Sequence, residues 1–260
     1  MNVKDGIKEL TRGTTLYGPL RDSYFRLFNR QERNRRKDRV AFYAQFVPKG
    51  DLVFDIGANI GEYTEAFLKL GARVVAVEPN PECVKILKTI RPSAHLTVEA
   101  VAIGAKAGEA VLRLCEDHGL STTSPEWFSA LQSSSRLSWH NWNRAIQVRL
   151  TTLDRLIAKY GEPSFIKIDV EGSEEAVLSG LTRAPRFLSF EFQSEFISST
   201  TSCLAKSCFS KRSRFNLFVA NSREFVFPQW IPREELIEYL EKSGLRRTET
   251  FGEIFACERP

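Results

Sequence analysis

The stretch Leu52–Asn80, LVFDIGANIGEYTEAFLKLGARVVAVEPN, decides the fold of this chain. A short apolar run ends at Asp55, a turn with two glycines follows, and the next residues carry apolar side chains at helical spacing. A second apolar run then ends in another acid, Glu78. This order of strand, glycine turn, helix, strand and acid is typical of the first βαβ unit of a nucleotide-binding α/β sheet.

The length and composition of the chain indicate a soluble, intracellular protein of moderate size. Its 260 residues carry 37 basic and 32 acidic side chains, and a formal charge of +5 gives little evidence for an anionic partner. The five cysteines show no CxxC pair, and the N-terminal sequence lacks the apolar core of a signal peptide. We therefore expect reduced thiols, no membrane span and a cytoplasmic location.

Residues 1–49 precede the first strand, and we expect them to form an N-terminal helical cap. Apolar residues such as Tyr24 and Phe28 are followed by a basic cluster that ends at Arg39. Such a cluster can bind nucleic acid, but it lacks interleaved aromatic residues, which favours a solvated helix face. Residues 50–260 are predicted to form the main α/β domain.

Residues 116–145 interrupt the regular pattern of that domain. They contain serine and threonine runs, three of the four tryptophans (among them Trp139) and two of the three histidines, His118 and His140. A long polar insert with exposed aromatic residues is typical of a lid or substrate loop. The alternative, a variable excursion whose tryptophans only pack against the core, stays open.

Outside the insert the pattern predicts alternating strands and helices. Further strands are expected at 95–103, 109–115, 146–150, 165–170, 187–192, 215–220, 224–227 and 254–258, with 104–108 as the connection of a hairpin. Helices are expected after Pro81, from Thr152 to Gly161, after Ser173, at 200–209 and at 233–242.

The acids of the first βαβ unit indicate which cofactor it binds. Ligands of open α/β sheets lie beyond the carboxyl ends of the strands, where Asp55, Glu78, Asp169 and Glu191 are predicted. A dinucleotide site needs Gly-x-Gly-x-x-Gly, but the turn Gly57–Gly61 lacks the middle glycine and follows an acid directly. A carboxylate there repels a pyrophosphate and suits a cation, while Glu78 can accept from both hydroxyls of a ribose. These features favour S-adenosylmethionine over NAD.

Longer motifs strengthen this interpretation through a resemblance. DIGANIGEYT and VVAVEPNP resemble the first two motifs of class I S-adenosylmethionine-dependent methyltransferases. FIKIDVEGSEEAVLSGL and FLSFEF resemble, more narrowly, the FkbM family within that class, and TLDRL, FNLFVANSREF and PREELIEYL also fit it. The resemblance covers about residues 50–258. It implies a Rossmann-like, mostly parallel sheet of seven strands in the order 3-2-1-4-5-7-6, with strand 7 antiparallel and helices on both faces.

The resemblance also implies which residues contact the cofactor. Gly57 and Gly61 would let the backbone approach it, Asp55 would hold the loop and the methionine end, and Glu78 would bind the ribose. The family often has Asn where this chain has Ala100, so only backbone contacts are expected near that position. The full set of candidates is Asp55, Gly57, Ala58, Asn59, Gly61, Tyr63, Thr64, Glu78, Pro79, Asn80, Val101 and Asp169, of which Tyr63 could instead belong to the core.

A second set of residues suggests how an acceptor is activated. Lys167, Asp169 and Glu171 alternate along a strand, so they project to one side, and the buried lysine should contact a carboxylate. An alcohol acceptor must lose its proton to a base. Asp169 is the first choice for that base or for an acceptor orienter, Glu171 is the second, and Glu191, His118 and Lys167 complete the candidate catalytic group. Purely structural pairing of these charges stays open as an alternative.

The sequence therefore predicts an S-adenosylmethionine-dependent O-methyltransferase, with S-adenosylhomocysteine as product. The acceptor is expected to be a hydroxyl of a sugar, a polyketide or another small molecule. The carboxylates could bind Mg²⁺ through oxygen ligands, but no metal is expected. An NAD-dependent oxidoreductase and a catalytically silent, cofactor-binding regulatory protein are the alternatives. Neither nucleic acid nor membrane is an expected partner, and homo-oligomerisation is left open.

Overall fold

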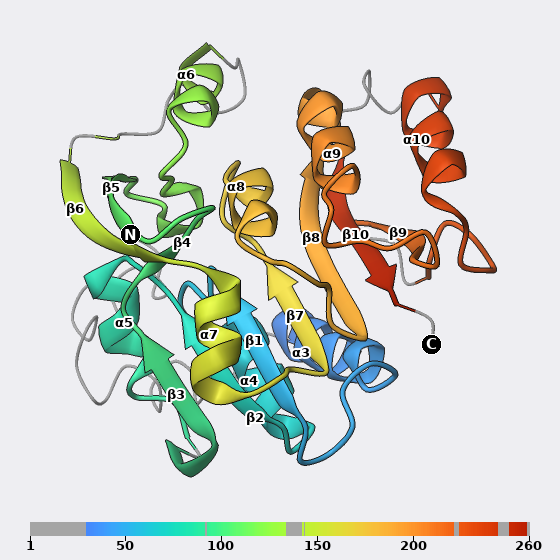
Figure 1. Cartoon of the computed structure of the whole chain (residues 1–260). Coiled ribbons are helices and arrows are strands. Elements are labelled where there is room, and N and C mark those ends of the chain that lie inside the picture. The colour runs from blue at the N-terminus through green and yellow to red at the C-terminus, as the bar shows by residue number, and fades with distance from the viewer. Residues whose placement is uncertain are drawn as a thin grey trace. The chain divides into compact units, whose positions relative to one another are not determined.

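The computed structural model describes residues 30–91, 93–133, 142, 144–220, 224–243 and 250–258. The chain divides into two compact units, Met1–Val101 and Ala102–Pro260, and its strands form a seven-stranded and a three-stranded sheet (Figure 1). Predictions for residues 1–29, including Tyr24 and Phe28, lie outside the described residues, as do Trp139 and His140 of the predicted insert.

The first unit contains the predicted βαβ arrangement. Its elements are α3 (Arg30–Tyr43), β1 (Leu52–Ile56), α4 (Glu62–Lys69), β2 (Arg73–Val77), α5 (Pro81–Leu87) and β3 (Leu96–Glu99). β2 pairs in parallel with both β1 and β3, and β1 is buried along its whole length, as its continuous apolar run predicts. Helix α5 begins where Asn80 accepts a hydrogen bond from the backbone N–H of Glu82 and Pro81 occupies the first turn.

Helix α3 packs on α4 through both charged and aromatic contacts. Arg36 lies 3.4 Å from the carboxylate of Glu65, and Arg39 donates to Glu62 at 2.7 Å. The ring of Tyr43, at the end of α3, meets Phe67 edge-on with 5.2 Å between centroids. Two arginines of the basic cluster therefore serve the packing of this unit, and their side chains, each 16% exposed, do not form the predicted solvated helix face. The role of residues 1–49 as a cap stays a prediction.

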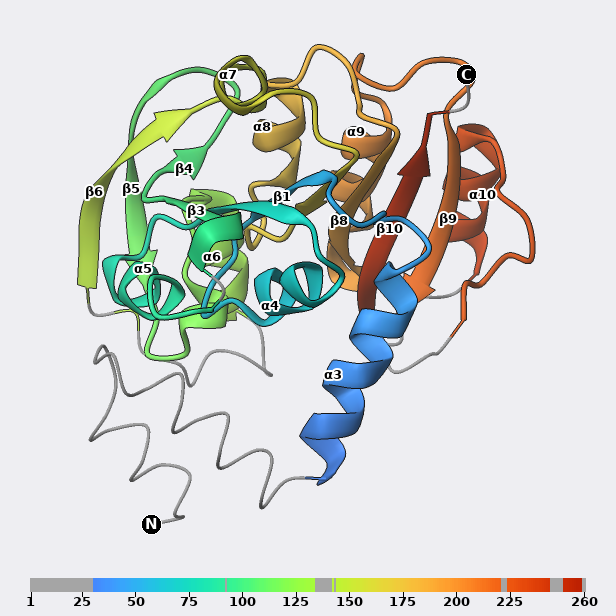
Figure 2. The same ribbon diagram turned by 90° about the horizontal axis from the view of Figure 1, so that it is seen from below.

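The second unit supplies the other four strands of the large sheet. Its elements there are α7 (Leu153–Tyr160), β7 (Phe165–Ile168), α8 (Glu174–Ser179), β8 (Phe187–Gln193), α9 (Ile197–Leu204), β9 (Arg214–Val219), α10 (Arg233–Lys242) and β10 (Phe251–Cys257). β10 lies between β8 and β9 and runs antiparallel to both, and the two views show these three strands side by side (Figures 1 and 2). The strand order β3-β2-β1-β7-β8-β10-β9 confirms the predicted 3-2-1-4-5-7-6 order.

The small sheet contradicts two of the sequence-based predictions. Its strands are β4 (Ala102–Ile103), β5 (Gly108–Leu114) and β6 (Arg144–Thr151), in the order β4-β6-β5. The single strand predicted at 95–103 is wrong, because β3 ends at Glu99 and residues 102–103 pair with β6 instead. The predicted hairpin is also wrong, because β6 separates β4 from β5. Both errors have the same cause: Ala102, Leu112, Leu114 and Val148 form a hydrophobic cluster of their own, which residues distant in sequence complete.

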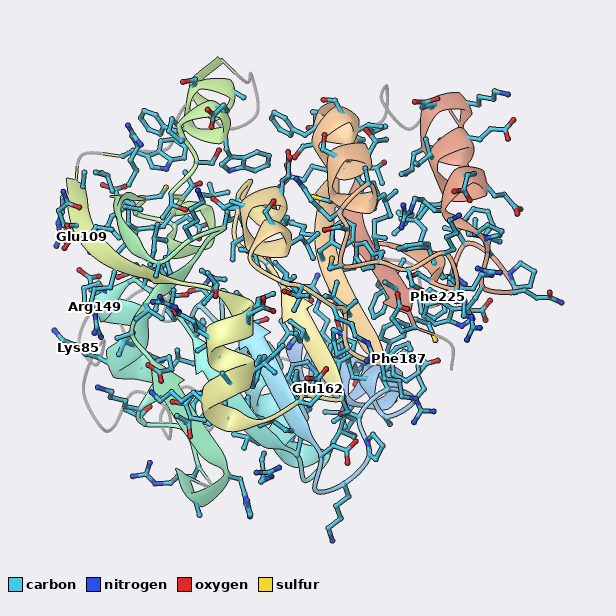
Figure 3. All side chains as sticks on the ribbon, viewed as in Figure 1. Lys85, Glu109, Arg149, Glu162, Phe187 and Phe225 are labelled. Atoms are coloured by element: carbon cyan, nitrogen blue, oxygen red, sulfur yellow. The ribbon has the colours of Figure 1, made fainter. Side chains whose placement is uncertain are left out.

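The predicted strand at 224–227 is likewise not a strand. The side chain of Asn216 on β9 holds this segment, because its amide donates to the carbonyl of Phe227 and accepts from the backbone N–H of Phe227. Phe225 then packs against Trp230 and Phe255, and Trp230 also contacts Phe187 (Figure 3). Aromatic packing thus fixes the segment without a regular ladder of hydrogen bonds.

Two further findings concern the whole chain. All five cysteines are free thiols. No helix in the described part of the chain combines the length and the apolar character that a membrane span requires.

Candidate functional site

In the first unit, the carboxylate of Glu78 joins the two loops that follow β1 and β2. One oxygen accepts from the backbone N–H of Asn59 at 2.8 Å, and the other accepts from the backbone N–H of Asn80 at 2.7 Å. The residue is 7% exposed. These two hydrogen bonds fix the orientation of a carboxylate that can accept up to about four.

Asp55 lies on β1 and is almost fully buried, with 1% exposure. Its carboxylate accepts a hydrogen bond of 2.6 Å from the hydroxyl of Thr64, which is on α4 and fully buried. This pair ties the first turn of the helix to the strand. Such burial suits the predicted role of Asp55 in holding the loop more than a direct contact with a ligand.

The turn between β1 and α4 adopts an unusual backbone conformation. Gly57, Asn59 and Gly61 have positive φ angles of 79°, 47° and 89°. The backbone N–H groups of Gly57 and Ala58 donate to the carbonyl of Val77 at 2.9 and 3.0 Å. The turn is therefore closed against the end of β2 by its own amides, together with the Asn59 amide that donates to Glu78.

Gly61 is also required by packing. A β-carbon at this position would lie 2.3 Å from Cδ1 of Ile90 and 2.9 Å from Cδ2 of Leu87, both of which are buried. Close contact with the end of α5 is therefore sufficient to require a glycine here, whether or not a cofactor also approaches the backbone.

The remaining cofactor candidates of this unit differ in their surroundings. Tyr63 is half-buried, stacks edge-on against Tyr43 and lies under the guanidinium of Arg39. These contacts match the alternative that it belongs to the core. Pro79 is half-buried and Val101 is buried. The cofactor roles of all these residues stay predictions.

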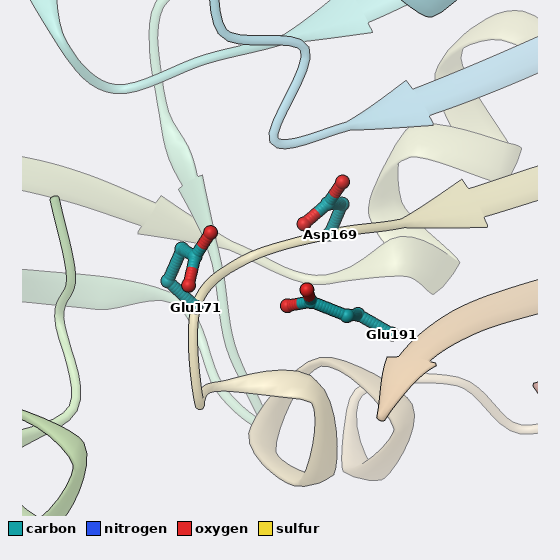
Figure 4. Close-up of side chains that lie close together, drawn as sticks. All are labelled: Asp169, Glu171 and Glu191. Atoms are coloured by element: carbon teal, nitrogen blue, oxygen red, sulfur yellow. The ribbon is translucent and has the colours of Figure 1, made fainter. Parts of the chain in front are cut away.

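In the second unit, three carboxylates converge beyond the end of β7 and beside the last residues of β8. Asp169 follows β7, Glu171 follows two residues later, and Glu191 lies on β8. Figure 4 shows the three side chains turned toward a common space, and each offers an oxygen within 4.8 Å of the other two. The predicted cluster of Asp169, Glu171 and Glu191 is thus present. His118, another candidate catalytic residue, is not part of this cluster and lies in a short 3-10 helix, His118–Leu120.

Lys167 makes the contact that the sequence predicts. It is 1% exposed in the middle of β7, and its Nζ lies 2.8 Å from Oδ2 of Asp169 and 4.0 Å from Glu253 on β10. A buried ammonium is costly without such partners. Lys167 supplies one positive charge beside three carboxylates, whose oxygens are the ligands that Mg²⁺ prefers.

Glu174 is a member of this site that the sequence interpretation missed. It is 6% exposed, and its Oε1 accepts from the backbone N–H groups of Val170 and Gly172 at 3.1 and 3.3 Å. It thereby holds a loop in which Glu171 and Gly172 both have positive φ angles, 53° and 88°. The available signal was an acid in the first turn of a helix directly after a glycine, where exposed amides need an acceptor.

Burial and mutual repulsion raise the pKa values of three of these acids. Burial raises the pKa of Glu174 to about 7. The pKa of Glu171 lies well above its usual value, chiefly because of burial and secondly because of the negative charge of Asp169. The pKa of Glu191 is also raised well above its usual value, chiefly by burial and secondly by the negative charge of Glu171. Oε2 of Glu171 is buried and has no hydrogen-bond partner among the residues that the structure describes. The group therefore holds protons that a single exposed carboxylate would release.

The described part of the predicted insert packs directly on this loop. The hydroxyl of Thr122 donates to the carbonyl of Glu171 at 2.7 Å, and the hydroxyls of Thr123 and Ser173 lie 2.9 Å apart. Trp127, at the start of α6 (Pro125–Ser133), covers Gly172, where a β-carbon would lie 2.5 Å from that of the tryptophan. At least this segment of the insert is thus part of the site's framework.

A cavity of about 120 Å³ lies beside the carboxylates in the second unit. Glu174 and Glu191 line it, together with Trp127 and Phe196. Two acids of the site therefore border a space that can hold a small ligand.

Comparison with known proteins matches residues 55–206 to the family described as Methyltransferase FkbM domain. Comparison with the curated proteins finds none that matches the chain. Among solved structures, precorrin-6y C5,15-methyltransferase from Geobacter metallireducens GS-15 is 11% identical, covers 86% of each chain and has a TM-score of 0.42. An O-methyltransferase from Bacillus cereus in complex with SAH is 11% identical, with 87% of this chain and 81% of that chain covered and a TM-score of 0.44. A putative RNA methyltransferase from Pyrococcus horikoshii is 10% identical, with 89% and 86% covered and a TM-score of 0.39.

Proposed function

The chain belongs to the FkbM methyltransferase domain family, and from that premise we propose that it transfers a methyl group from S-adenosylmethionine to a hydroxyl of a small molecule. The family match is the single observation that carries methyl transfer. The acceptor is a sugar, a polyketide or a similar hydroxylated compound. No nucleic acid or membrane partner is part of this proposal.

The first unit supports the choice of cofactor. When bound, S-adenosylmethionine supplies an electrophilic methyl group on a sulfonium. The carboxylate of Glu78, which the amides of Asn59 and Asn80 orient, would accept from the ribose hydroxyls. Asp55 and Thr64 hold the adjoining turn in shape.

The same observations speak against NAD. A dinucleotide places its pyrophosphate on the amides at a helix N-terminus. Here the amides of Gly57 and Ala58 donate to Val77, and the amide of Asn59 donates to a carboxylate. The carboxylate of Glu78 at this turn therefore disfavours a pyrophosphate.

The carboxylates of the second unit support the acceptor chemistry. As the acceptor oxygen forms its new bond to carbon, the carbon–sulfur bond breaks and the hydroxyl proton passes to a carboxylate. Asp169, with a 31% exposed side chain, remains a candidate for this base. The lining of the cavity favours Glu191 beside it, because that acid borders the space and its raised pKa makes its ionised form a stronger base. The insert, through Thr122 and Trp127, would shape the acceptor pocket.

A pair of titrations tests the cofactor. We expect calorimetry to detect S-adenosylhomocysteine binding and no NADH binding. Glu78→Gln should weaken S-adenosylhomocysteine about 10- to 100-fold, because hydrogen bonds to a charged group contribute about 1.5–3 kcal/mol. Glu162→Gln, which neutralises an exposed acid, is the control. NADH binding without a response to S-adenosylhomocysteine would overturn the proposal.

A second pair of variants tests the acceptor side. Asp169→Asn and Glu191→Gln should leave S-adenosylhomocysteine binding within about twofold, yet lower methyl transfer by about 10²- to 10⁴-fold if the residue is the base. Release of S-adenosylhomocysteine across a panel of hydroxylated acceptors measures the rate. Unchanged rates in both variants would remove the carboxylates from the mechanism and leave them a structural role.

A further inference from the structure

The cavity in the second unit is built from three separate parts of the sequence. Its wall includes Glu126 and Trp127 from α6, Glu174 from α8 and Glu191 from β8. Phe192 from β8 and Phe196, just before α9, complete the part of the wall used here. Its volume of about 120 Å³ is somewhat smaller than an apolar cavity of about 150 Å³ that holds one benzene ring. It therefore takes a head group of about five heavy atoms and not a whole large metabolite.

The charge of this wall is one-sided. Glu126, Glu174 and Glu191 are acids, and none of the lining residues, all of which belong to the described part of the chain, is lysine, arginine or histidine. Behind the wall, Asp169 and Glu171 bring oxygens within 4.8 Å of an oxygen of Glu191. The charged groups that act most strongly on Glu191 include the three carboxylates of Glu171, Asp169 and Glu174 and the cation of Lys167. An anionic ligand would meet strong repulsion here, whereas a cation would relieve it.

The aromatic part of the wall also suits a cation. The rings of Trp127 and Phe196 have centroids 4.5 Å apart and planes inclined at 51°. Tryptophan faces attract ammonium groups through their quadrupole, most strongly where water is excluded. Trp127 is 5% exposed, and its indole N–H has no hydrogen-bond partner among the described residues. A buried donor without a partner on the wall of a cavity indicates that a ligand atom satisfies it.

We propose that this cavity binds a positively charged amine of the methyl acceptor, which makes the acceptor an amino alcohol or an amino sugar. A bound ammonium favours the ionised form of these acids, so the acids that hold protons without it release them and neutralise its charge. The rings of Trp127 and Phe196 contact the adjacent carbon atoms of the ligand, and a neighbouring oxygen of the ligand accepts from the indole N–H. Acceptors that carry a phosphate or a carboxylate at the same place are excluded by charge. The inference rests on the proposed function, because it takes the cavity to be the acceptor side of the site.

Three probes of matched size test the charge selectivity. Binding of 2-aminoethanol, ethane-1,2-diol and glycolate to the full chain is titrated by ligand-observed NMR at pH 8, above the pKa of about 7 of Glu174. We expect 2-aminoethanol to bind at least tenfold more tightly than the neutral diol, and glycolate not to bind. Equal affinity for the three, or a preference for glycolate, would overturn the inference.

Substitutions locate the binding in the cavity. Glu191→Gln should lower the affinity for 2-aminoethanol at least tenfold. Glu162→Gln, at an exposed acid of the same unit, should leave that affinity unchanged. Trp127→Phe should keep most of the affinity for tetramethylammonium, which needs the ring but not the N–H, and Trp127→Leu should lose it. Thermal unfolding of each variant is recorded, and the two pairs are independent, so failure of one variant to fold leaves the other pair decisive. Binding unaffected by any of these changes would place the amine elsewhere.

Two controls separate this inference from its rivals. Mg²⁺ is titrated alone and in competition: if Mg²⁺ binds and 2-aminoethanol does not, the acids form a metal site and the inference is wrong. S-adenosylhomocysteine is titrated into the same samples. If it binds while 2-aminoethanol shows no preference over the diol, the proposed function stands and only the amine inference fails. If 2-aminoethanol binds and S-adenosylhomocysteine does not, the cavity is an amine site and the cofactor assignment fails.

Discussion

At the scale of single residues, the loop after β7 depends on one glycine for two separate reasons. Gly172 has a φ angle of 88°, and the side chain of Trp127 occupies the space that a β-carbon on Gly172 would need. Gly161 has a similar φ angle of 96°, but a β-carbon there would meet nothing within 4 Å. Both positions thus have a positive φ angle, and only Gly172 is also confined by packing.

This difference gives a prediction for stability. Gly161→Ala should cost about 1–3 kcal/mol of unfolding free energy, because its φ of 96° and ψ of 173° form a backbone conformation that is essentially restricted to glycine. Gly172→Ala should cost a further 1–3 kcal/mol or so, because the indole must move. Chemical denaturation of both variants measures the difference. An equal decrease in unfolding free energy for the two variants would mean that the Trp127 side chain moves aside at no energetic cost. Its contact with Gly172 would then not stabilise the loop.

At the scale of elements, the segment before α6 holds the carboxylate loop in place. Thr122 is 1% exposed, and its hydroxyl donates to the carbonyl of Glu171 while it accepts from the backbone N–H of Ser124 at 2.9 Å. One side chain therefore connects the insert to the loop that carries Glu171. This connection holds the described start of the insert against the carboxylate loop.

Thr122→Val, which keeps the shape and removes the hydroxyl, should lower the unfolding free energy by about 1–3 kcal/mol, since a buried N–H and a buried carbonyl each lose a partner. Thr201→Val is the matched control, because its hydroxyl bonds to the carbonyl of Ser198 in an exposed position on α9. That variant should change stability by less than about 0.5 kcal/mol. If the two variants lower the unfolding free energy by the same amount, the hydrogen bonds of Thr122 do not stabilise the protein more than an exposed hydrogen bond does.

At the scale of the whole molecule, the buried acids predict how stability responds to pH. An acid whose pKa is higher in the folded state holds its proton more tightly there, so folding is penalised once the unfolded chain ionises. For Glu174 the penalty is absent below about pH 4.5, grows as the pH rises and is complete above pH 7. A shift from 4.5 to about 7 corresponds to about 3 kcal/mol. Glu171 and Glu191 act in the same direction.

Glu174→Gln tests this dependence, because the amide oxygen can still accept from Val170 and Gly172. Relative to the unsubstituted chain, we expect the variant to be similar in stability at pH 4.5 and to gain up to about 3 kcal/mol at pH 8. Denaturant unfolding at a series of pH values provides the measurement, with Glu162→Gln as control. A constant difference across the pH range would show that Glu174 does not titrate between the two states.

Local sequence determined the elements of the large sheet and the family. β1 and β2 are mainly apolar runs, with Asp55 as the last residue but one of β1 and Glu78 directly after β2, and such runs are typical of strands covered by helices on both faces. The glycine turn at 57–61 and the Asn80 cap are likewise local, because each depends on the conformation of a few neighbouring residues. These signals were sufficient for the strand order, through the resemblance, and for the pairing of Lys167 with a carboxylate.

Only the tertiary structure decided what depends on residues far apart in the sequence. The small sheet exists because β6 joins β4 and β5 around its own cluster, which no period in residues 95–115 reveals. In the sequence, Glu174 looks like an ordinary acid at the start of a helix. In the structure it is buried and accepts hydrogen bonds from the backbone of the loop that carries Glu171. The amine-sized cavity likewise appears only when α6, β8 and α9 come together. Periodicity reports which face of an element is buried, whereas burial of a charge depends on what the rest of the chain places beside it.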